Sequence, residues 1–247
     1  MKIFKHNDLN RVDVLDERFY KVGDEYFPSV TTVLQVYPKG YWYDAWLKDV
    51  GRNADTIRNE AAEKGSNVHN AIERILLGGE ERWIVDGKQM YTLIEWQMIC
   101  RFMEFHSKYL NQGEQVAAET QLFSKSMKLG GTCDLVTKIN GETWLIDFKT
   151  SNGLHKTNEM QLAVYKKMWD EKNNPKIDRY GVLWLSAATR TEKEFQGKGW
   201  QLKEFTSKHD HNIRLYNHTR ALWDEENPNY KPKNLTYPNS FKLSVAV

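Results

Sequence analysis

Two aspartates and one lysine in the middle of the chain form the group of residues best suited to chemistry. The dipeptide Asn140-Gly141 separates two segments of alternating polarity, which predicts a hairpin with a type I′ turn. In the register that this turn sets, Asp134 lies opposite Asp147. Because like charges directly across a sheet repel, we expect both carboxylates to bind a divalent cation together with water and phosphate. Lys149 lies on the same face, two residues after Asp147, where it could hold a phosphate oxygen or orient an attacking water.

Glu119 is a third carboxylate that strand pairing could bring to this pair. A turn near Ser126-Met127 would place Glu119 opposite Asp134, giving three acidic side chains in one row across three strands. This turn contains no glycine, and a slip of one residue would move Glu119 to the other face of the sheet. The sequence leaves both registers open.

An exposed ladder of ion pairs is the alternative interpretation of Asp134, Asp147 and Lys149. The segment WLIDFKT argues against it, because apolar residues occupy both faces of this strand and its neighbour. Those residues are Trp144, Ile146 and Phe148 on one face, and Leu145 and Val136 on the other. A buried carboxylate cluster normally needs a cation, so a metal site is the favoured interpretation.

Hydrophobic periodicity predicts the elements that position these residues. A period of two predicts three strands within residues 115–150, and an apolar run from Gly181 predicts a strand buried on both faces. Apolar residues spaced three and four apart predict helices over about 60–77, 90–110 and 158–171. A last helix over 211–226 precedes a tail rich in proline and asparagine.

The N-terminal part is expected to add a hairpin and two helical segments. A turn near Gly23-Asp24 predicts the hairpin, and Ser29 is a suitable N-cap for a helix in PSVTTVLQVY. The segment YWYDAWLKDV has four aromatic residues in its first six positions. We expect these aromatics to pack in the core, and not to form a stacking platform, because aromatic residues of helices are usually buried.

Composition describes a folded protein and excludes several classes. Of 247 residues, 40% are hydrophobic and 28% are charged, and the mean hydropathy of −0.70 is typical of a soluble protein. The chain has no apolar run of the roughly 18 residues that span a membrane, and its first ten residues lack the apolar core of a signal peptide. Cys100 and Cys133 are too few for an iron–sulfur cluster. The net charge of +2 is too small to indicate nucleic acid by itself.

Four sequence elements in a fixed order resemble the PD-(D/E)XK nuclease superfamily. The segments ETQLF, GGTCDLV, WLIDFKT and QLAVY resemble its RecB-like exonuclease branch, with the acid-x-Lys element at Asp147-Phe148-Lys149. Gln161 and Tyr165 match the Gln-x-x-x-Tyr element, and His69 in KGSNVHNAIE matches the upstream helix histidine. The segment PSVTTVL is similar to the start of the mitochondrial genome maintenance exonuclease family and of bacteriophage exonucleases. The resemblance covers residues 28–186.

This resemblance implies an α/β fold with an αβββαβ core, a mixed central sheet and flanking helices. It makes His69, Asp134, Asp147 and the carbonyl of Phe148 ligands of Mg²⁺ or Mn²⁺, with Lys149 and Glu119 assisting the reaction. From the residues alone, His69 is more simply a polar residue at the edge of its helix.

DNA contacts are the expected role of a second group of residues. Gln161 and Tyr165 lie four apart and so share one helix face. Ser29, Thr31 and Thr32 could donate hydrogen bonds to phosphates, or could act only as caps. Lysines near the motifs support a phosphate track, although such residues are often only solvated. These lysines are Lys125, Lys128, Lys166 and Lys167.

The implied activity is a metal-dependent DNA exonuclease acting on single strands or frayed ends in replication, repair or recombination. A structure-selective or duplex-processing endonuclease and a non-catalytic nucleic-acid-binding module are the alternatives. We expect a nuclease domain over 1–208, with its core at about 60–190 and the N-terminal hairpin and helices at 1–59. A C-terminal helix and tail would follow over 209–247. The expected location is intracellular, in the cytoplasm, or in the host cytoplasm if the protein is viral.

Overall fold

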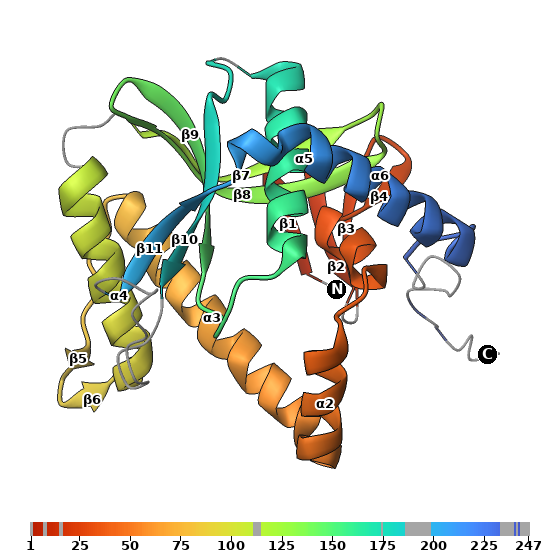
Figure 1. The fold of residues 1–247 in the computed structure, drawn as a ribbon. Helices are drawn as coiled ribbons and strands as arrows, with labels where there is room; N and C mark the ends of the chain where they lie inside the picture. Colours follow the sequence, from red (N-terminus) through yellow and green to blue (C-terminus); the bar gives the residue numbers. More distant parts are fainter. Residues whose placement is uncertain are drawn as a thin grey trace, which may run out of the picture.

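The three strands predicted between Gln115 and Thr150 form the centre of a five-stranded sheet. A computed structural model describes residues 2–6, 9–14, 17–110, 115–173, 175–185, 199–232, 240 and 242. The sheet contains β7 (Gln115–Ser124), β8 (Leu129–Ile139), β9 (Glu142–Lys149), β10 (Arg179–Leu185) and β11 (Trp200–Glu204), in the order β11-β10-β9-β8-β7. Strands β9 and β10 are parallel and the other pairs are antiparallel, so the expected mixed sheet is confirmed (Figure 1).

Helices cover both faces of this sheet. Helices α3 (Ala54–Leu76) and α4 (Leu93–Phe105) pack on one face, with Ile146, Phe148 and Leu183 from the strands. Helices α5 (Lys156–Lys172) and α6 (His209–Glu226) pack on the other, with Val136, Leu145 and Val182. Figure 1 shows α3 and α4 on one side of the strands and α5 and α6 on the other. The result is a three-layer α/β structure with the expected αβββαβ core.

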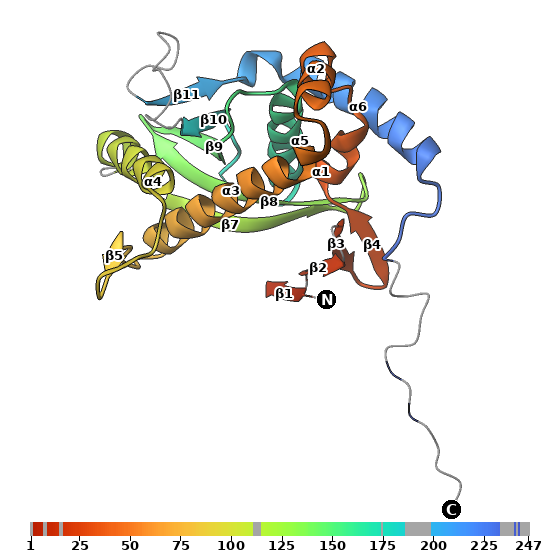
Figure 2. The same ribbon diagram turned by 90° about the horizontal axis from the view of Figure 1, so that it is seen from below.

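The predicted helices are present, with different ends. Helix α3 begins at Ala54, earlier than the periodicity indicated, and runs diagonally past β7 and β8 (Figure 2). Thr92 caps α4 in a reciprocal capping box with Glu95, and the chain continues as a π-helix, η3 (His106–Leu110). A two-stranded hairpin of β5 (Ile84–Val85) and β6 (Lys88–Gln89) lies between α3 and α4.

The N-terminal segment forms a second antiparallel sheet. Its strands are β1 (Lys2–His6), β2 (Leu9–Val14), β3 (Glu17–Val22) and β4 (Glu25–Pro28), in that order. The predicted hairpin is β3–β4, with Val22 paired to Glu25 across the turn; β1 and β2 were not predicted. Tyr20 lies against Gly130 of β8, where a Cβ atom would be 2.1 Å from its ring, so this glycine lets the small sheet dock.

The expected helix after Ser29 is short. Helix α1 (Val30–Val33) passes directly into the 3-10 turn η1 (Leu34–Val36), and Val30, Val33 and Leu34 are buried in the α5 face of the core. Two further 3-10 turns, η2 (Gly51–Asn53) and η5 (Thr206–Lys208), precede α3 and α6.

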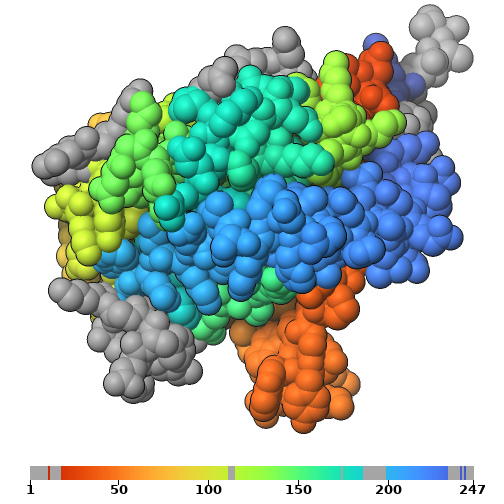
Figure 3. Space-filling view, turned by 45° about the horizontal axis from the view of Figure 1, so that its top comes forward, coloured from red at the N-terminus to blue at the C-terminus, as the bar shows by residue number. Residues whose placement is uncertain are grey.

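The expectation that YWYDAWLKDV packs its aromatics in the core is wrong. The segment forms α2 (Tyr41–Val50), but none of its residues is buried, and Tyr41 and Trp42 are 75% and 83% exposed. Gly40, at a φ of 82°, turns the chain outward, and α2 projects from the body of the molecule (Figure 3). Helical periodicity does not reveal whether a second element faces the helix.

The C-terminal helix buries Tyr216 and Trp223 in the core that it shares with α5. After α6, Tyr230 stacks on Phe19 of the N-terminal sheet, with ring centroids 4.8 Å apart. Residues 186–188 of the predicted strand and 233–239 of the predicted tail lie outside the described residues. The division at residue 208 stays a prediction. Among the described residues, no helix is long and apolar enough to cross a membrane.

Candidate active site

Asp134 and Asp147 lie where the β8–β9 ladder ends. Asn140 and Gly141 both have positive φ, at 52° and 84°, as a type I′ turn requires. The ladder then pairs Ile139 with Glu142 and continues in the predicted register to Leu135 and Ile146. Beyond that pair, the backbone N–H of Phe148 donates to Asp134 Oδ2 at 2.6 Å. Where the two strands separate, the Asp134 side chain thus accepts the hydrogen bond that a backbone carbonyl of the neighbouring strand would otherwise accept.

Both carboxylates are buried, with Asp134 7% and Asp147 2% exposed. This burial argues against an exposed ion-pair ladder. Leu145 and Val136 belong to the core beneath α5, while Trp144, Ile146 and Phe148 belong to the core beneath α3 and α4, as the sequence indicated.

Asp147 is held by Lys149 and Gln161. Lys149 Nζ lies 2.6 Å from Asp147 Oδ2, and Gln161 Nε2 donates to Asp147 Oδ1 at 2.9 Å. Lys149 also donates to Gln161 Oε1 at 3.4 Å, which closes a three-residue network between β9 and α5. Gln161 therefore positions a carboxylate of the site and is itself buried.

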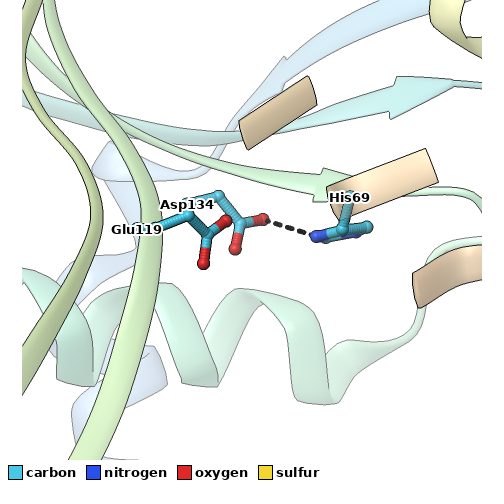
Figure 4. A group of neighbouring side chains, drawn as sticks. All are labelled: His69, Glu119 and Asp134. Atoms are coloured by element: carbon cyan, nitrogen blue, oxygen red, sulfur yellow. Dashed lines mark ion pairs between the residues drawn. The ribbon is translucent and has the colours of Figure 1, made fainter. Parts of the chain in front are cut away.

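His69 reaches Asp134 from α3. Its Nδ1 atom lies 3.5 Å from Asp134 Oδ2 (Figure 4). Its ring meets that of Phe148 edge to face, with centroids 5.9 Å apart. Gly65, one turn earlier, lies against Thr150, since a Cβ atom there would be 3.1 Å from Thr150 Oγ1. This close approach brings α3, and His69 with it, to the end of β9.

Glu119 joins His69 and Asp134 in one cluster. One ligand atom of each lies within 4.8 Å of the others. The β7–β8 ladder pairs Ala118 with Leu135 and Cys133 with Thr120, so Glu119 lies level with Asp134, and Glu119 has a φ of 44°. A positive φ is uncommon for a residue other than glycine and marks local strain. Figure 4 shows the two carboxylates side by side with His69 facing them.

Burial and mutual repulsion shift the titration of this cluster. Burial and then the charge of Asp147 raise the pKa of Asp134 to about 6. Burial, Asp134, Glu73 and Asp147 raise the pKa of Glu119 to about 9. Burial lowers the pKa of Lys149, but the charges of Asp147 and Asp134 outweigh it, and the net shift is upward. The site holds acidic groups that resist ionising together beside a lysine that keeps its proton.

These donors fit a hard divalent cation. Ligand atoms about 2.1 Å from Mg²⁺ lie roughly 3 to 4 Å apart, so a small contraction of the cluster would complete such a site. Burial and mutual repulsion oppose the ionisation of the two carboxylates, so a bound cation would stabilise their charged forms. Within the described residues, Asp147 is outside the group of three, and its oxygens contact Lys149 and Gln161. The carbonyl of Phe148 as a ligand stays a prediction.

The other predicted DNA-binding residues lie at three different places. Tyr165 is buried with its ring against Gly131, where a Cβ atom would be 2.4 Å from Tyr165 Cε1. Ser29 is buried and caps α1, and its Oγ accepts from the Thr32 amide at 2.9 Å. Its hydroxyl also bonds those of Thr31 and Thr32, of which Thr31 is exposed.

The lysines of the β7–β8 turn are not brought to the site. Lys128 forms an exposed ion pair with Glu25 at 3.2 Å. It precedes Asp134 by six residues, or about 20 Å at the usual rise of a strand. Lys125 lies in the same turn, and its charge lowers the pKa of Lys172, after the larger effect of that residue's burial. On α5, Lys166 pairs with Asp170 at 2.6 Å. The roles proposed for these residues stay predictions.

Glu73 is the residue near the site that the sequence analysis missed. It follows His69 by four residues and so lies on the same face of α3, and its charge raises the pKa of Glu119. Its spacing from His69 was the available signal. The amphipathic pattern concealed it, because polar residues are expected beside the apolar stripe.

Comparisons with known proteins agree with this geometry at the level of the family. A family model described as the PD-(D/E)XK nuclease superfamily matches residues 37–230. No curated protein matches the chain. Among solved structures, one titled "Crystal structure of SSO0001" is similar, with 15% sequence identity and a TM-score of 0.29. The match covers 51% of this chain and 57% of that chain.

Proposed function

The chain belongs to the PD-(D/E)XK nuclease superfamily, and from this membership we propose that it is a divalent-metal-dependent deoxyribonuclease that hydrolyses phosphodiester bonds. The observation that carries the proposal is the cluster of buried Asp134 with the half-buried Glu119 and His69, beside the network of Asp147, Lys149 and Gln161. A structural sheet would gain nothing from burying these acids together, because their mutual repulsion opposes folding.

His69, Glu119 and Asp134 would hold a magnesium or manganese ion, with Asp147 and the carbonyl of Phe148 as further ligands. When bound, the ion supplies Lewis acidity toward the scissile phosphate. Its positive charge would also oppose the burial and the repulsion that together raise the pKa of Glu119 and keep it protonated near neutral pH.

Lys149 and Gln161 contribute the protein's own electrostatics. Lys149 keeps its proton, so it presents a fixed positive charge where the phosphate gains negative charge as a water oxygen attacks phosphorus and the ester bond breaks. Gln161 fixes the orientation of Asp147 through one hydrogen bond. Tyr165, packed against Gly131, supports α5 one turn after Gln161.

We assign the activity more finely as an exonuclease acting on single-stranded or frayed DNA ends in replication, repair or recombination. This assignment rests on the resemblance of the four sequence elements to the RecB-like branch. A linear single strand labelled at either end and a circular single strand separate it from the endonuclease alternative. An exonuclease degrades only the linear strand, whereas an endonuclease also opens the circle.

The test of the proposal is cleavage of labelled DNA by the purified protein with Mg²⁺ or Mn²⁺, before and after chelation. We expect cleavage that stops in chelator and is lost in Asp134→Asn, while circular dichroism stays unchanged. Cleavage at the wild-type rate by Asp134→Asn, or in excess chelator, would reject the proposed site.

A further inference from the structure

A cavity of about 560 Å³ connects the candidate active site with α2. Lys149 and Gln161 line it at the active site, and Lys39 and Tyr43 line it next to α2. Its walls are the segment 31–39 on one side and the first turn of α5, residues 155–158, on the other. The space therefore begins at the residues that hold Asp147 and ends at the helix that projects from the molecule.

The lining of this cavity suits a polyanion. Among the described residues it contains three lysines and no acidic side chain. Lys156 and Lys149 are paired with Glu159 and Asp147, while Lys39 lies over the ring of Tyr43, 4.5 Å from its centroid. Arg58 of α3, which pairs with Asp55, donates to the Tyr43 hydroxyl at 2.9 Å where the cavity meets α2.

Two exposed aromatic residues come directly before Tyr43, the residue of α2 that lines the cavity. Tyr41 and Trp42 precede Tyr43 in the first turn of α2, and their ring centroids are 5.3 Å apart. The Trp42 indole is 83% exposed, on a helix that buries no residue. Its packing therefore adds little to the free energy of unfolding. Figure 3 shows the orange segment that contains α2 standing clear of the rest of the molecule.

We infer that single-stranded DNA entering the active site occupies this cavity and stacks its next bases on Trp42 and Tyr41. The inference rests on the proposed function, because it takes the scissile phosphate to lie at Lys149. Bases of a single strand offer free faces to aromatic rings, whereas the bases of a duplex are stacked on one another inside it. Lysines along the cavity and continuity with the site favour this occupant over a protein partner, which would need no cationic path to the carboxylates.

The test compares binding of single-stranded and duplex DNA in excess chelator, so that cleavage does not interfere. Fluorescein-labelled oligodeoxythymidine of about 16 nucleotides and a blunt duplex of similar length serve as probes. We expect the double substitution Tyr41→Ala and Trp42→Ala to weaken single-strand binding by about tenfold or more, and duplex binding by less than about twofold. The single variant Trp42→Phe keeps an aromatic face and should therefore retain most of the wild-type affinity for single strands.

Leu77→Ala is the matched control, because Leu77 is 69% exposed at the end of α3 and lies outside the cavity. It should leave both affinities unchanged. Since α2 buries no residue, the double variant should melt at the wild-type temperature. Unchanged single-strand affinity, or an equal loss for single strand and duplex, overturns the inference.

The inference and the proposed function can fail separately. If wild type cleaves DNA and the double variant binds single strands normally, the stacking surface is wrong and the nuclease stands. If wild type cleaves no DNA under any metal but single-strand binding depends on Trp42, the nuclease is wrong and the surface binds a strand for another purpose. If the double substitution changes the oligomeric state and leaves DNA affinity unchanged, α2 makes contacts with protein and the inference is overturned.

Discussion

At the scale of single residues, the site contains two different carboxylate environments. Asp147 has a cation and an amide donor on its two oxygens, whereas Asp134 contacts a histidine and a backbone N–H. Glu119 faces Asp134 and carries the largest opposition to ionisation. The two environments indicate different roles. Asp147 is held in one orientation, whereas a cation that binds the cluster around Asp134 would displace protons from it.

Asp147→Asn should retain the fold and reduce cleavage by roughly 100-fold or more, because a neutral amide is a poor ligand of magnesium. Cleavage of end-labelled DNA at low magnesium checks this. Asp224→Asn on α6 is the control, since Asp224 is exposed and pairs with Arg220. Near-normal activity in Asp147→Asn would remove Asp147 from the site.

Lys149→Ala should slow the chemical step by about 100- to 1,000-fold and leave DNA affinity nearly unchanged, because its charge matters most as negative charge develops on phosphate. Single-turnover cleavage at saturating enzyme isolates this step. If affinity falls and the single-turnover rate does not, Lys149 is a phosphate clamp and not a catalyst.

His69→Ala should raise the metal concentration for half-maximal cleavage by about tenfold or more, and more strongly for manganese, because imidazole suits the softer ion. Titration of both metals against wild type and variant measures the shift. His218→Ala, at an exposed position on α6, provides the control. An unshifted metal curve with a lowered melting temperature would leave His69 as a packing residue of α3.

At the scale of elements, glycines decide how closely the helices approach the strands that carry the site. Gly131 lets the ring of Tyr165 lie on β8, and Gly65 lets α3 lie on the end of β9. The two approaches set the positions of Gln161 and His69, which reach the carboxylates from α5 and α3.

Gly131→Ala should destabilise the protein by about 1–3 kcal/mol, because the new Cβ atom would overlap the buried ring of Tyr165. It should also reduce cleavage by displacing α5. Gly153→Ala is the control, since nothing lies within 4 Å of a Cβ atom there. Urea denaturation of both variants measures the difference; equal stability would mean that α5 adjusts without cost.

At the scale of the whole molecule, the buried acids link stability to pH and to metal. The pKa of Asp134 rises from 3.8 to about 6, and that of Glu119 rises from 4.5 to about 9. The folded state therefore binds more protons than the unfolded state between about pH 4 and pH 9, so its stability falls as pH rises through this range.

Without metal, the melting temperature should fall between pH 5 and pH 9, and Glu119→Gln should flatten the fall above pH 7, where Asp134 is already ionised. Magnesium should raise the melting temperature more at pH 8 than at pH 6, because the cation competes with fewer protons. Thermal melts across pH, with and without metal, measure both effects. The same pH slope in wild type and Glu119→Gln would show that Glu119 titrates normally.

The sequence by itself determined the three central strands of the large sheet, the register of β8 with β9 and the acids that these strands carry. Asn140-Gly141 set the pairing of β8 with β9 because a type I′ turn admits few other residues, and period-two alternation assigned Leu145 and Ile146 to opposite cores. The helices of residues 60–77 and 158–171 followed from their apolar stripes. Local patterns sufficed here because each depends on neighbours close in the chain.

Only the tertiary structure decided which long-range groups meet and which surfaces stay open. It brought Gln161 to Asp147 and His69 to Asp134 through close approaches at Gly131 and Gly65, which no local pattern encodes. It gave Glu119 a positive φ and a shifted pKa, and it left Tyr41 and Trp42 of α2 exposed where core residues were expected. The physical reason is the same in each case: burial and electrostatic coupling depend on what packs against a residue from a distant part of the chain, and periodicity reports only which face of its own element a residue occupies.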